Sequence, residues 1–192
     1  MSDVVIIGGG PAGASAALFA ARAGLSTVVI DADKGGTRRA LINNHLGFPD
    51  GIAGPDLVAH GRSQAENAGA TWVEGTVAAI DGSAGAFTVR TDDGKAFEAP
   101  SIILATGVTK DLADAVGIAT EDGREPRMPW MATVDSAGRS SVPGIWITGI
   151  AGGVSAHTII TAGDGARVAI NLISDLRGER HVDHDFIPAA SA

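Results

Sequence analysis

Short runs of apolar, mostly β-branched residues recur along the chain. They cover residues 4–7, 27–30, 101–105 and 144–148, and each run is followed closely by glycine or by an aspartate. A strand that is apolar at nearly every position is typical of a parallel sheet that is covered on both faces. The pattern therefore predicts a central parallel sheet with loops at the ends of its strands.

Helical segments separate or follow these runs. Residues 12–23 are small or good helix formers, and Gly24 stands where a helix would end. Together with the runs at 4–7 and 27–30 they predict a βαβ unit. Residues 56–68 have a helical composition, and residues 158–176 carry apolar side chains mostly at helical spacing.

The remaining segments predict loops and antiparallel strands. Residues 32–54 are rich in Gly and Asn and predict one long loop, a length that usually signals function. A strand is expected over 71–80, and a hairpin over 86–90 and 96–99 around the turn Asp92-Asp93-Gly94. Residues 110–142 are irregular but contain the apolar cluster 128–131. This cluster is interpreted as packing in the core, as closing over a cofactor or as forming a dimer contact.

Composition limits the class of protein. With 192 residues, 45% hydrophobic and 19% charged, the chain fits one domain, expected over 1–178, with a flexible tail over 179–192. The net charge of −8 gives no basic surface for nucleic acid, and the absence of cysteine removes disulfides and thiol chemistry from this chain. Asp3 and the early glycines argue against a signal peptide or a membrane anchor, so we expect a cytoplasmic protein.

A glycine motif follows the first strand. Gly8, Gly10 and Gly13 form G-x-G-x-x-G, and Pro11 and Ala12 begin the next helix, so the backbone can approach a pyrophosphate at a helix N-terminus. Asp31 closes the second strand at the position of a carboxylate that binds an adenosine ribose. The pattern predicts a dinucleotide without a 2′-phosphate, which FAD and NAD both satisfy; a tight turn followed by a surface acid is the alternative.

Four motifs resemble the flavin domain of bacterial thioredoxin reductases. They lie at 5–13, 44–52, 102–107 and 161–166, in the order of that family. The resemblance implies a Rossmann-like, three-layer α/β fold that binds FAD, with a central parallel sheet, a β-hairpin or meander on one face and helices on the other.

The resemblance also implies cofactor contacts. Asn44 matches a residue at the isoalloxazine edge, the amides of His157 and Thr158 match the pyrimidine end, and Val77 matches a backbone contact to adenine. Further cofactor-lining positions are Ala32, Arg38, Thr106, Gly107 and Gly149. Asn44 is alternatively a turn cap, Arg38 and Arg39 are alternatively solvated, and His157 contributes either its side chain or only its amide.

The chain departs from that family in two ways. The segment 108–144 is too short for the family's NADPH-binding domain, and no C-x-x-C pair is present. Ile150 stands where the family has a ribityl-binding aspartate, a loss of about 1.5–3 kcal/mol or roughly tenfold in affinity.

These departures set the functional expectation. We expect an FAD-binding oxidoreductase without an identified catalytic residue, which cannot reduce thioredoxin on its own. Its electron donor and acceptor would be supplied in trans, as NAD(P)H or a redox partner protein, with no membrane partner and with a homodimer as one possible assembly. The alternatives are a non-catalytic FAD or nucleotide module, a partner subunit, or a regulatory NAD-binding domain. The tail residues His181, Asp183 and His184 are expected to be solvated rather than to bind a metal.

Overall fold

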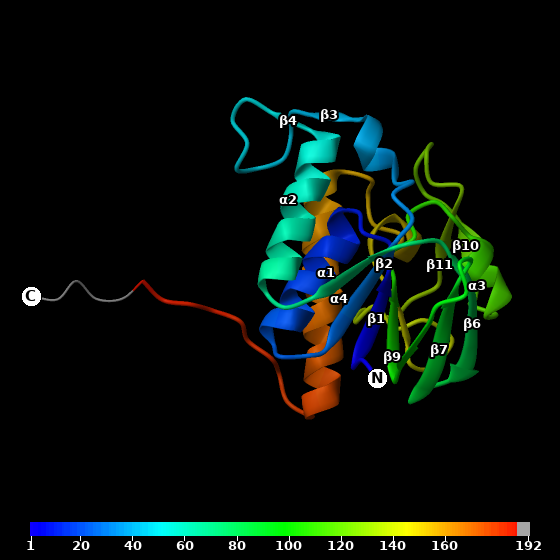
Figure 1. The fold of residues 1–192 in the computed structure, drawn as a ribbon. Coiled ribbons are helices and arrows are strands. Elements are labelled where there is room, and N and C mark those ends of the chain that lie inside the picture. The colour runs from blue at the N-terminus through cyan, green and yellow to red at the C-terminus, as the bar shows by residue number, and fades with distance from the viewer. Residues whose placement is uncertain (188–192) are drawn as a thin grey trace, which may run out of the picture.

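Five parallel strands form the centre of the molecule (Figure 1). The computed structural model describes residues 1–187. In spatial order the strands are β12 (Ile145–Ile147), β9 (Ser101–Leu104), β1 (Val4–Ile7), β2 (Thr27–Asp31) and β5 (Thr71–Glu74). The predicted α/β fold with a central parallel sheet is confirmed.

The sheet is buried on both faces because alternate residues of each strand enter different cores. In β1, Val5 and Ile7 pack toward one side, and Val4 and Ile6 pack toward the other. This explains why the strands are apolar at nearly every position rather than alternating with polar residues.

Helices cover one face of the sheet (Figure 1). They are α1 (Pro11–Arg22), α2 (Gly54–Asn67) and α4 (Thr158–Arg177). The buried positions of α1 are Gly13 and six alanines, so its neighbours approach closely. A Cβ on Gly61 of α2 would lie 2.9 Å from the Cβ of Ala14.

A three-stranded antiparallel meander covers the opposite face (Figure 1). It consists of β6 (Val77–Ser83), β7 (Ala86–Thr91) and β8 (Ala96–Ala99). The predicted hairpin is therefore confirmed, with Gly94 at φ +85° in its turn. Phe87 and Val89 of β7 pack into the same core as Val5 and Ile7.

Two expectations about local structure were wrong. The strand expected over 71–80 is two strands in different sheets, because the chain turns at Gly75, whose N–H donates to the carbonyl of Asp31 at 3.0 Å. The loop expected over 32–54 contains a 3₁₀ turn (Gly36–Arg39) and the antiparallel pair β3 (Leu41–Ile42) and β4 (Ile52–Ala53).

The segment 108–144 is also more ordered than its sequence predicts. It forms α3 (Asp111–Ala115) and the antiparallel pair β10 (Thr120–Asp122) and β11 (Trp130–Ala132). Met128, Trp130 and Met131 are buried, with 2–6% of each residue exposed. Of the three interpretations of the 128–131 cluster, the structure thus supports core packing.

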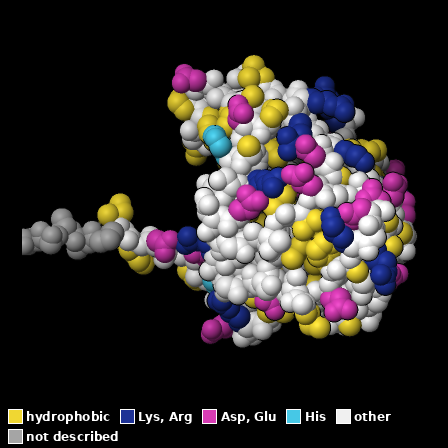
Figure 2. Space-filling view, in the orientation of Figure 1, with side chains coloured by type: hydrophobic (Ala, Val, Ile, Leu, Met, Phe, Trp, Pro, Cys, Tyr) yellow, Lys and Arg dark blue, Asp and Glu magenta, His cyan; other side chains and the backbone are white. Residues whose placement is uncertain are grey.

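Charged side chains lie over the surface and along the tail. Figure 2 shows acidic and basic side chains interspersed over the visible face. The tail residues Asp183 and Asp185 form ion pairs with Arg22 of α1, at 2.8 Å and 2.6 Å, and the ion pair lowers the pKa of Asp183.

Residues 188–192, part of the segment expected to be flexible, lie outside the described residues. Within residues 1–187 no helix is long and apolar enough to cross a membrane, and no group of three or more potential metal ligands occurs.

Candidate functional site

The order of the strands predicts the position of a ligand site at the carboxyl ends of the strands. From β1 the chain proceeds to β2 and β5 on one side, and later to β9 and β12 on the other side. The direction of winding therefore reverses between β1 and β9. In open α/β sheets, ligands bind outside the carboxyl ends of the strands at this reversal. The glycine motif follows β1 here, and Thr106 and Gly107 follow β9.

The three motif glycines have different surroundings. Gly8 has φ +103°, and a Cβ there would collide with the carbonyl oxygen of Ala105. A Cβ on Gly13 would collide with the carbonyl oxygen of Gly8. Around Gly10, no atom of the described residues 1–187, apart from its two chain neighbours, lies within 4 Å of the Cβ position. The first and third glycines thus allow the turn and the close packing, while the second faces open space where a ligand can approach the backbone.

The start of α1 is free to bind an anion. Gly10 is the N-cap residue, Pro11 is at the first helical turn, and no side chain caps the first turn. Its free N–H groups and the positive end of the helix dipole favour a phosphate. Gly10 and this helix start therefore fit the pyrophosphate of a dinucleotide.

Asp31 lies beside this loop at the end of β2. Its Oδ1 accepts the N–H of Gly9 at 3.0 Å. Gly9 leaves no room for a side chain, since a Cβ would collide with the ring of Trp72. The carboxylate of Asp31 is thus held where the loop and β2 meet, at the position predicted for a ribose ligand.

A buried aspartate joins β12 to α4. The Oδ2 of Asp164 accepts hydrogen bonds from Thr148 Oγ1 at 2.7 Å and from the amide of Gly149 at 2.8 Å. Its Oδ1 binds Arg167 at 2.8 Å, and the side chain is 5% exposed. Asp164 therefore fixes the loop after β12 against α4, next to α1, where a Cβ on Gly149 would lie 2.9 Å from Ala12 Cβ.

The loop 43–51 contacts the start of α4. His45 Nδ1 lies 2.9 Å from the hydroxyl oxygen of the buried Thr158, and burial lowers the pKa of His45. The ring of Phe48 packs edge-on against that of His45, with 5.6 Å between the ring centroids, and stacks on that of His60, with 6.4 Å between the centroids. His157 is the N-cap of α4, and no side chain caps its amides. This end of the site thus combines a helix start with a loop held by aromatic and imidazole rings.

The structure places the predicted site residues in two groups. Those at the carboxyl ends of β1, β2, β9 and β12 are Gly8, Gly10, Pro11, Ala12, Gly13, Asp31, Ala32, Thr106, Gly107 and Gly149. Those near the start of α4 are Asn44, His157 and Thr158, since the hydrogen bond of His45 joins the loop to the helix.

The structure places the other two predicted residues elsewhere in the chain. Val77 begins β6, two residues after Gly75, whose N–H donates to the carbonyl of Asp31 at 3.0 Å, and Arg38 forms an ion pair with Asp33. Sequence reasoning gave no role to His45 and Asp164, although both lie in the motifs 44–52 and 161–166.

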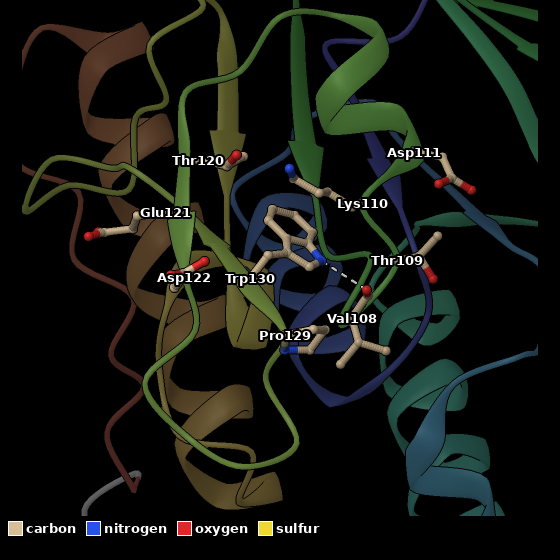
Figure 3. A pocket seen from close by; sticks show the side chains of 9 residues that line it. All are labelled: Val108, Thr109, Lys110, Asp111, Thr120, Glu121, Asp122, Pro129 and Trp130. Carbon is tan, nitrogen blue, oxygen red and sulfur yellow. Dashed lines mark hydrogen bonds between the residues drawn. The ribbon is translucent and has the colours of Figure 1, made fainter.

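A cavity of 660 Å³ opens beside the loop after β9 (Figure 3). Trp130 forms one wall, with its indole N–H donating to the carbonyl of Val108 at 2.8 Å. Lys110, Glu121 and Asp122 surround the opening. A second cavity of 470 Å³ lies between α1, α2 and the loop 43–51, with Phe48 and Leu18 among its lining residues.

This arrangement agrees with the sequence comparison. Residues 2–127 match the sequence model of the pyridine nucleotide-disulphide oxidoreductases. The chain belongs to this family. The match includes the glycine motif, Asp31, the loop 43–51 and the strand before Thr106, so the family resemblance is confirmed over the first three of the four motifs.

Curated members of the pyridine nucleotide-disulphide oxidoreductase family resemble the chain over part of their length. A thioredoxin reductase of Rickettsia bellii is 40% identical over 123 residues, which are 62% of this chain and 39% of that protein. A thioredoxin reductase of Streptomyces coelicolor is 38% identical over 143 residues, or 70% and 44%. The chain thus spans less than half the length of these relatives.

Solved structures of pyridine nucleotide-disulphide oxidoreductases share the fold. A thioredoxin reductase from Gloeobacter violaceus aligns with a TM-score of 0.81 at 20% identity, covering 97% of this chain and 99% of that one. The atypical thioredoxin reductase TRi from Desulfovibrio vulgaris Hildenborough aligns with a TM-score of 0.79 at 20% identity, covering 93% and 99%. This likeness supports the three-layer architecture.

Proposed function

We propose that the chain binds FAD and acts as an oxidoreductase whose electron donor and acceptor are supplied in trans. The observation that carries this proposal is the open space at Gly10 beside the uncapped start of α1. That space lies where the sheet reverses its winding, which is the position of nucleotide ligands in this class of fold.

The chain's own residues would hold FAD at two ends. The amides of Ala12 and Gly13 would bind the pyrophosphate, and Asp31 would accept hydrogen bonds from the adenosine ribose. The amides at the start of α4, at His157 and Thr158, would face the pyrimidine end of the flavin. A helix N-terminus there favours the negative charge that a reduced flavin carries. FAD, when bound, supplies the electron-transfer chemistry.

A donor and an acceptor from outside the chain follow from its composition. The chain has no cysteine to form a redox dithiol, and residues 108–144 form α3 and the β10–β11 pair instead of a βαβ unit. We therefore propose NAD(P)H or a redox partner protein as the donor, and a separate molecule as the acceptor. The names of the relatives imply thioredoxin as a partner only for the relatives themselves.

An anaerobic reduction experiment tests this activity. FAD-loaded protein is mixed with NADH or NADPH, and the flavin absorbance is followed before and after addition of a generic electron acceptor. Bleaching by the nucleotide and recovery with the acceptor are expected. A flavin that stays oxidised with both nucleotides, yet is reduced by dithionite, would contradict donation by free NAD(P)H.

A flavin that neither nucleotide reduces would favour the second candidate function, a non-catalytic FAD module or partner subunit. The observation that favours it is the charge at the 660 Å³ cavity, because three of its four charged lining residues, Asp111, Glu121 and Asp122, repel a nucleotide phosphate and only Lys110 attracts one. Reduction of the flavin by a cell extract, but by neither nucleotide alone, would identify dependence on a protein partner.

A further inference from the structure

A tryptophan of the edge strand β5 lies against the glycine motif. Trp72 pairs with Val29 of β2, and its half-buried side chain packs on the core of the helix-covered face of the sheet. The Cζ2 atom of its indole occupies the space that a Cβ on the buried Gly9 would need. The benzo edge of the ring therefore forms a wall against the backbone of Gly9.

The carboxylate of Asp31 lies on the same side of Gly9. A Cβ on Gly9 would collide with this carboxylate as well as with the indole. The N–H of Gly9 donates to Oδ1 of Asp31 at 3.0 Å. A shift of Gly9 would therefore disturb two groups of the proposed site, the carboxylate predicted to bind the ribose and the backbone of the next residue, Gly10.

An arginine of α2 holds the indole. The guanidinium carbon of Arg62 lies 5.6 Å from the centre of the Trp72 ring, within the range of a cation–π contact. Its nitrogen atoms donate to Glu74 at 2.7 Å and to Glu66 at 3.1 Å, so its position is fixed from β5 and from α2. The indole thus contacts the glycine motif with its edge and Arg62 with its ring.

The glycine motif needs such a wall because it carries no side chains of its own. Residues 8–10 are three successive glycines, and glycine has the greatest conformational freedom of all residues. A binding loop that must lose this freedom when a ligand arrives binds more weakly than one that is already held in place. A large ring with few rotatable bonds restrains its neighbours at little entropic cost.

We infer that Trp72 is a positioning residue for the adenosine half of the ligand: its ring holds Gly9, and Gly9 in turn keeps Asp31 and the backbone at Gly10 in place. The identity of the whole ligand rests on the proposed function. The chemistry recognised at this end is an adenosine diphosphate, which is a part of both FAD and NAD.

Hydrogen exchange tests the positioning role without a ligand. Trp72→Phe removes the part of the ring that contains Cζ2 and keeps an aromatic side chain in β5. The amide of Gly9 is expected to exchange about fivefold faster in this variant, because its bond to Asp31 opens more often. The rate is measured by NMR, with the amides of β1 as internal references that stay unchanged.

Titration with ADP tests the consequence for binding. Trp72→Phe is expected to weaken the binding of ADP and of FAD by the same factor, about fivefold. Trp146→Phe is the matched control, since Trp146 packs in the same core and its ring lies 4.9 Å from Arg139 instead. Trp146→Phe is expected to lower stability without changing the affinity for ADP, which a merely structural role of Trp72 would not explain.

Arg62→Ala keeps the test valid if Trp72→Phe fails to fold. Loss of the cation–π contact is expected to weaken ADP binding about twofold to fivefold. Arg90→Ala is its control, because Arg90 is exposed on the meander and pairs with Asp81. Arg90→Ala is expected to leave the affinity unchanged.

The outcomes separate this inference from the proposed function. Unchanged ADP affinity in both Trp72→Phe and Arg62→Ala, or equal weakening by Trp146→Phe, would overturn the positioning role while leaving FAD binding intact. A protein that binds ADP with the predicted dependence on Trp72, but binds no FAD, would support the positioning role and refute the proposed function. Failure of the wild type to bind either compound would refute both.

Discussion

At the scale of single residues, a substitution of Gly10 is expected to weaken ligand binding with little effect on stability. It has φ −67°, an angle that any residue adopts, and in the described part of the chain only its two neighbours in sequence come within 4 Å of its Cβ position. We predict that Gly10→Ala lowers the free energy of unfolding by less than about 1 kcal/mol, the cost of a weaker N-cap, and weakens FAD binding at least tenfold. Urea unfolding and FAD titration measure the two effects.

Gly8 provides the matched comparison for that prediction. A side chain at Gly8 would require φ +103° and a shift of the Ala105 backbone, so Gly8→Ala is expected to cost about 1–3 kcal/mol of stability. Equal loss of stability in both variants, with FAD binding to Gly10→Ala unimpaired, would show that the open space at Gly10 is not the ligand site.

The sequence could predict the features of the site that depend on residues near one another in the chain. The spacing of Gly8, Gly10 and Gly13 depends on local backbone geometry, which the residue types reveal directly. The contacts of Asp164 and of Glu125, which accepts the N–H of Ala156, reach residues 15–31 positions away, so no local pattern indicates them. These partners become visible only when the fold brings β12, α4 and the β10–β11 segment together.

At the scale of elements, the buried ion pair of Asp164 should contribute more to the free energy of unfolding than the exposed ion pair of Asp175. Asp164→Asn replaces one of the two carboxylate oxygens, which accept hydrogen bonds from Thr148, Gly149 and Arg167, with an amide donor in a buried setting, at an expected cost of about 1–3 kcal/mol. Asp175→Asn removes a carboxylate that also binds an arginine, Arg139, but is 43% exposed, and should cost less than about 1 kcal/mol. Urea unfolding of both variants checks this order; the reverse order would contradict it.

The β7–β8 turn should respond to acid. Hydrogen bonds from Lys95 and Thr91 lower the pKa of Asp93 from 3.8 to about 2. Because the folded pKa is depressed, the turn's stabilisation is fully present above pH 3.8 and is lost as the pH falls toward 2. The NMR signal of the Asp93 carboxyl is expected to titrate near pH 2, and Lys95→Ala should raise that midpoint. A midpoint near 3.8 in the wild type would contradict these contacts.

Predicted elements were correct where local patterns and packing agree. The four buried strands and three long helices satisfy both. The strand expected over 71–80 failed because residues on both sides of Gly75 favour extended structure, while only tertiary contacts decide which sheet each half joins. The β10–β11 pair was missed because its strands have three residues each, too few for a periodic pattern.

At the scale of the whole molecule, the segment 108–144 forms a short, packed connection between β9 and β12. Burial of Met128, Trp130 and Met131 fixes this connection on the meander side of the sheet. Because Trp130 is already buried within the chain, a dimer contact is not needed to cover it. The homodimer stays a prediction; exposed Leu46, Ile159 and Ile160 are apolar side chains that a second copy would cover.

The central proposal is that FAD binds at the carboxyl ends of β1 and β9. Flavin analysis tests it directly: the purified protein is denatured, the released cofactor is identified by its absorption spectrum and mass, and cofactor-free protein is titrated with FAD and with NAD. We predict FAD at up to one per chain, or saturable binding of added FAD by the free protein. Protein that carries no flavin and fails to bind added FAD, or that binds only NAD, would contradict the account.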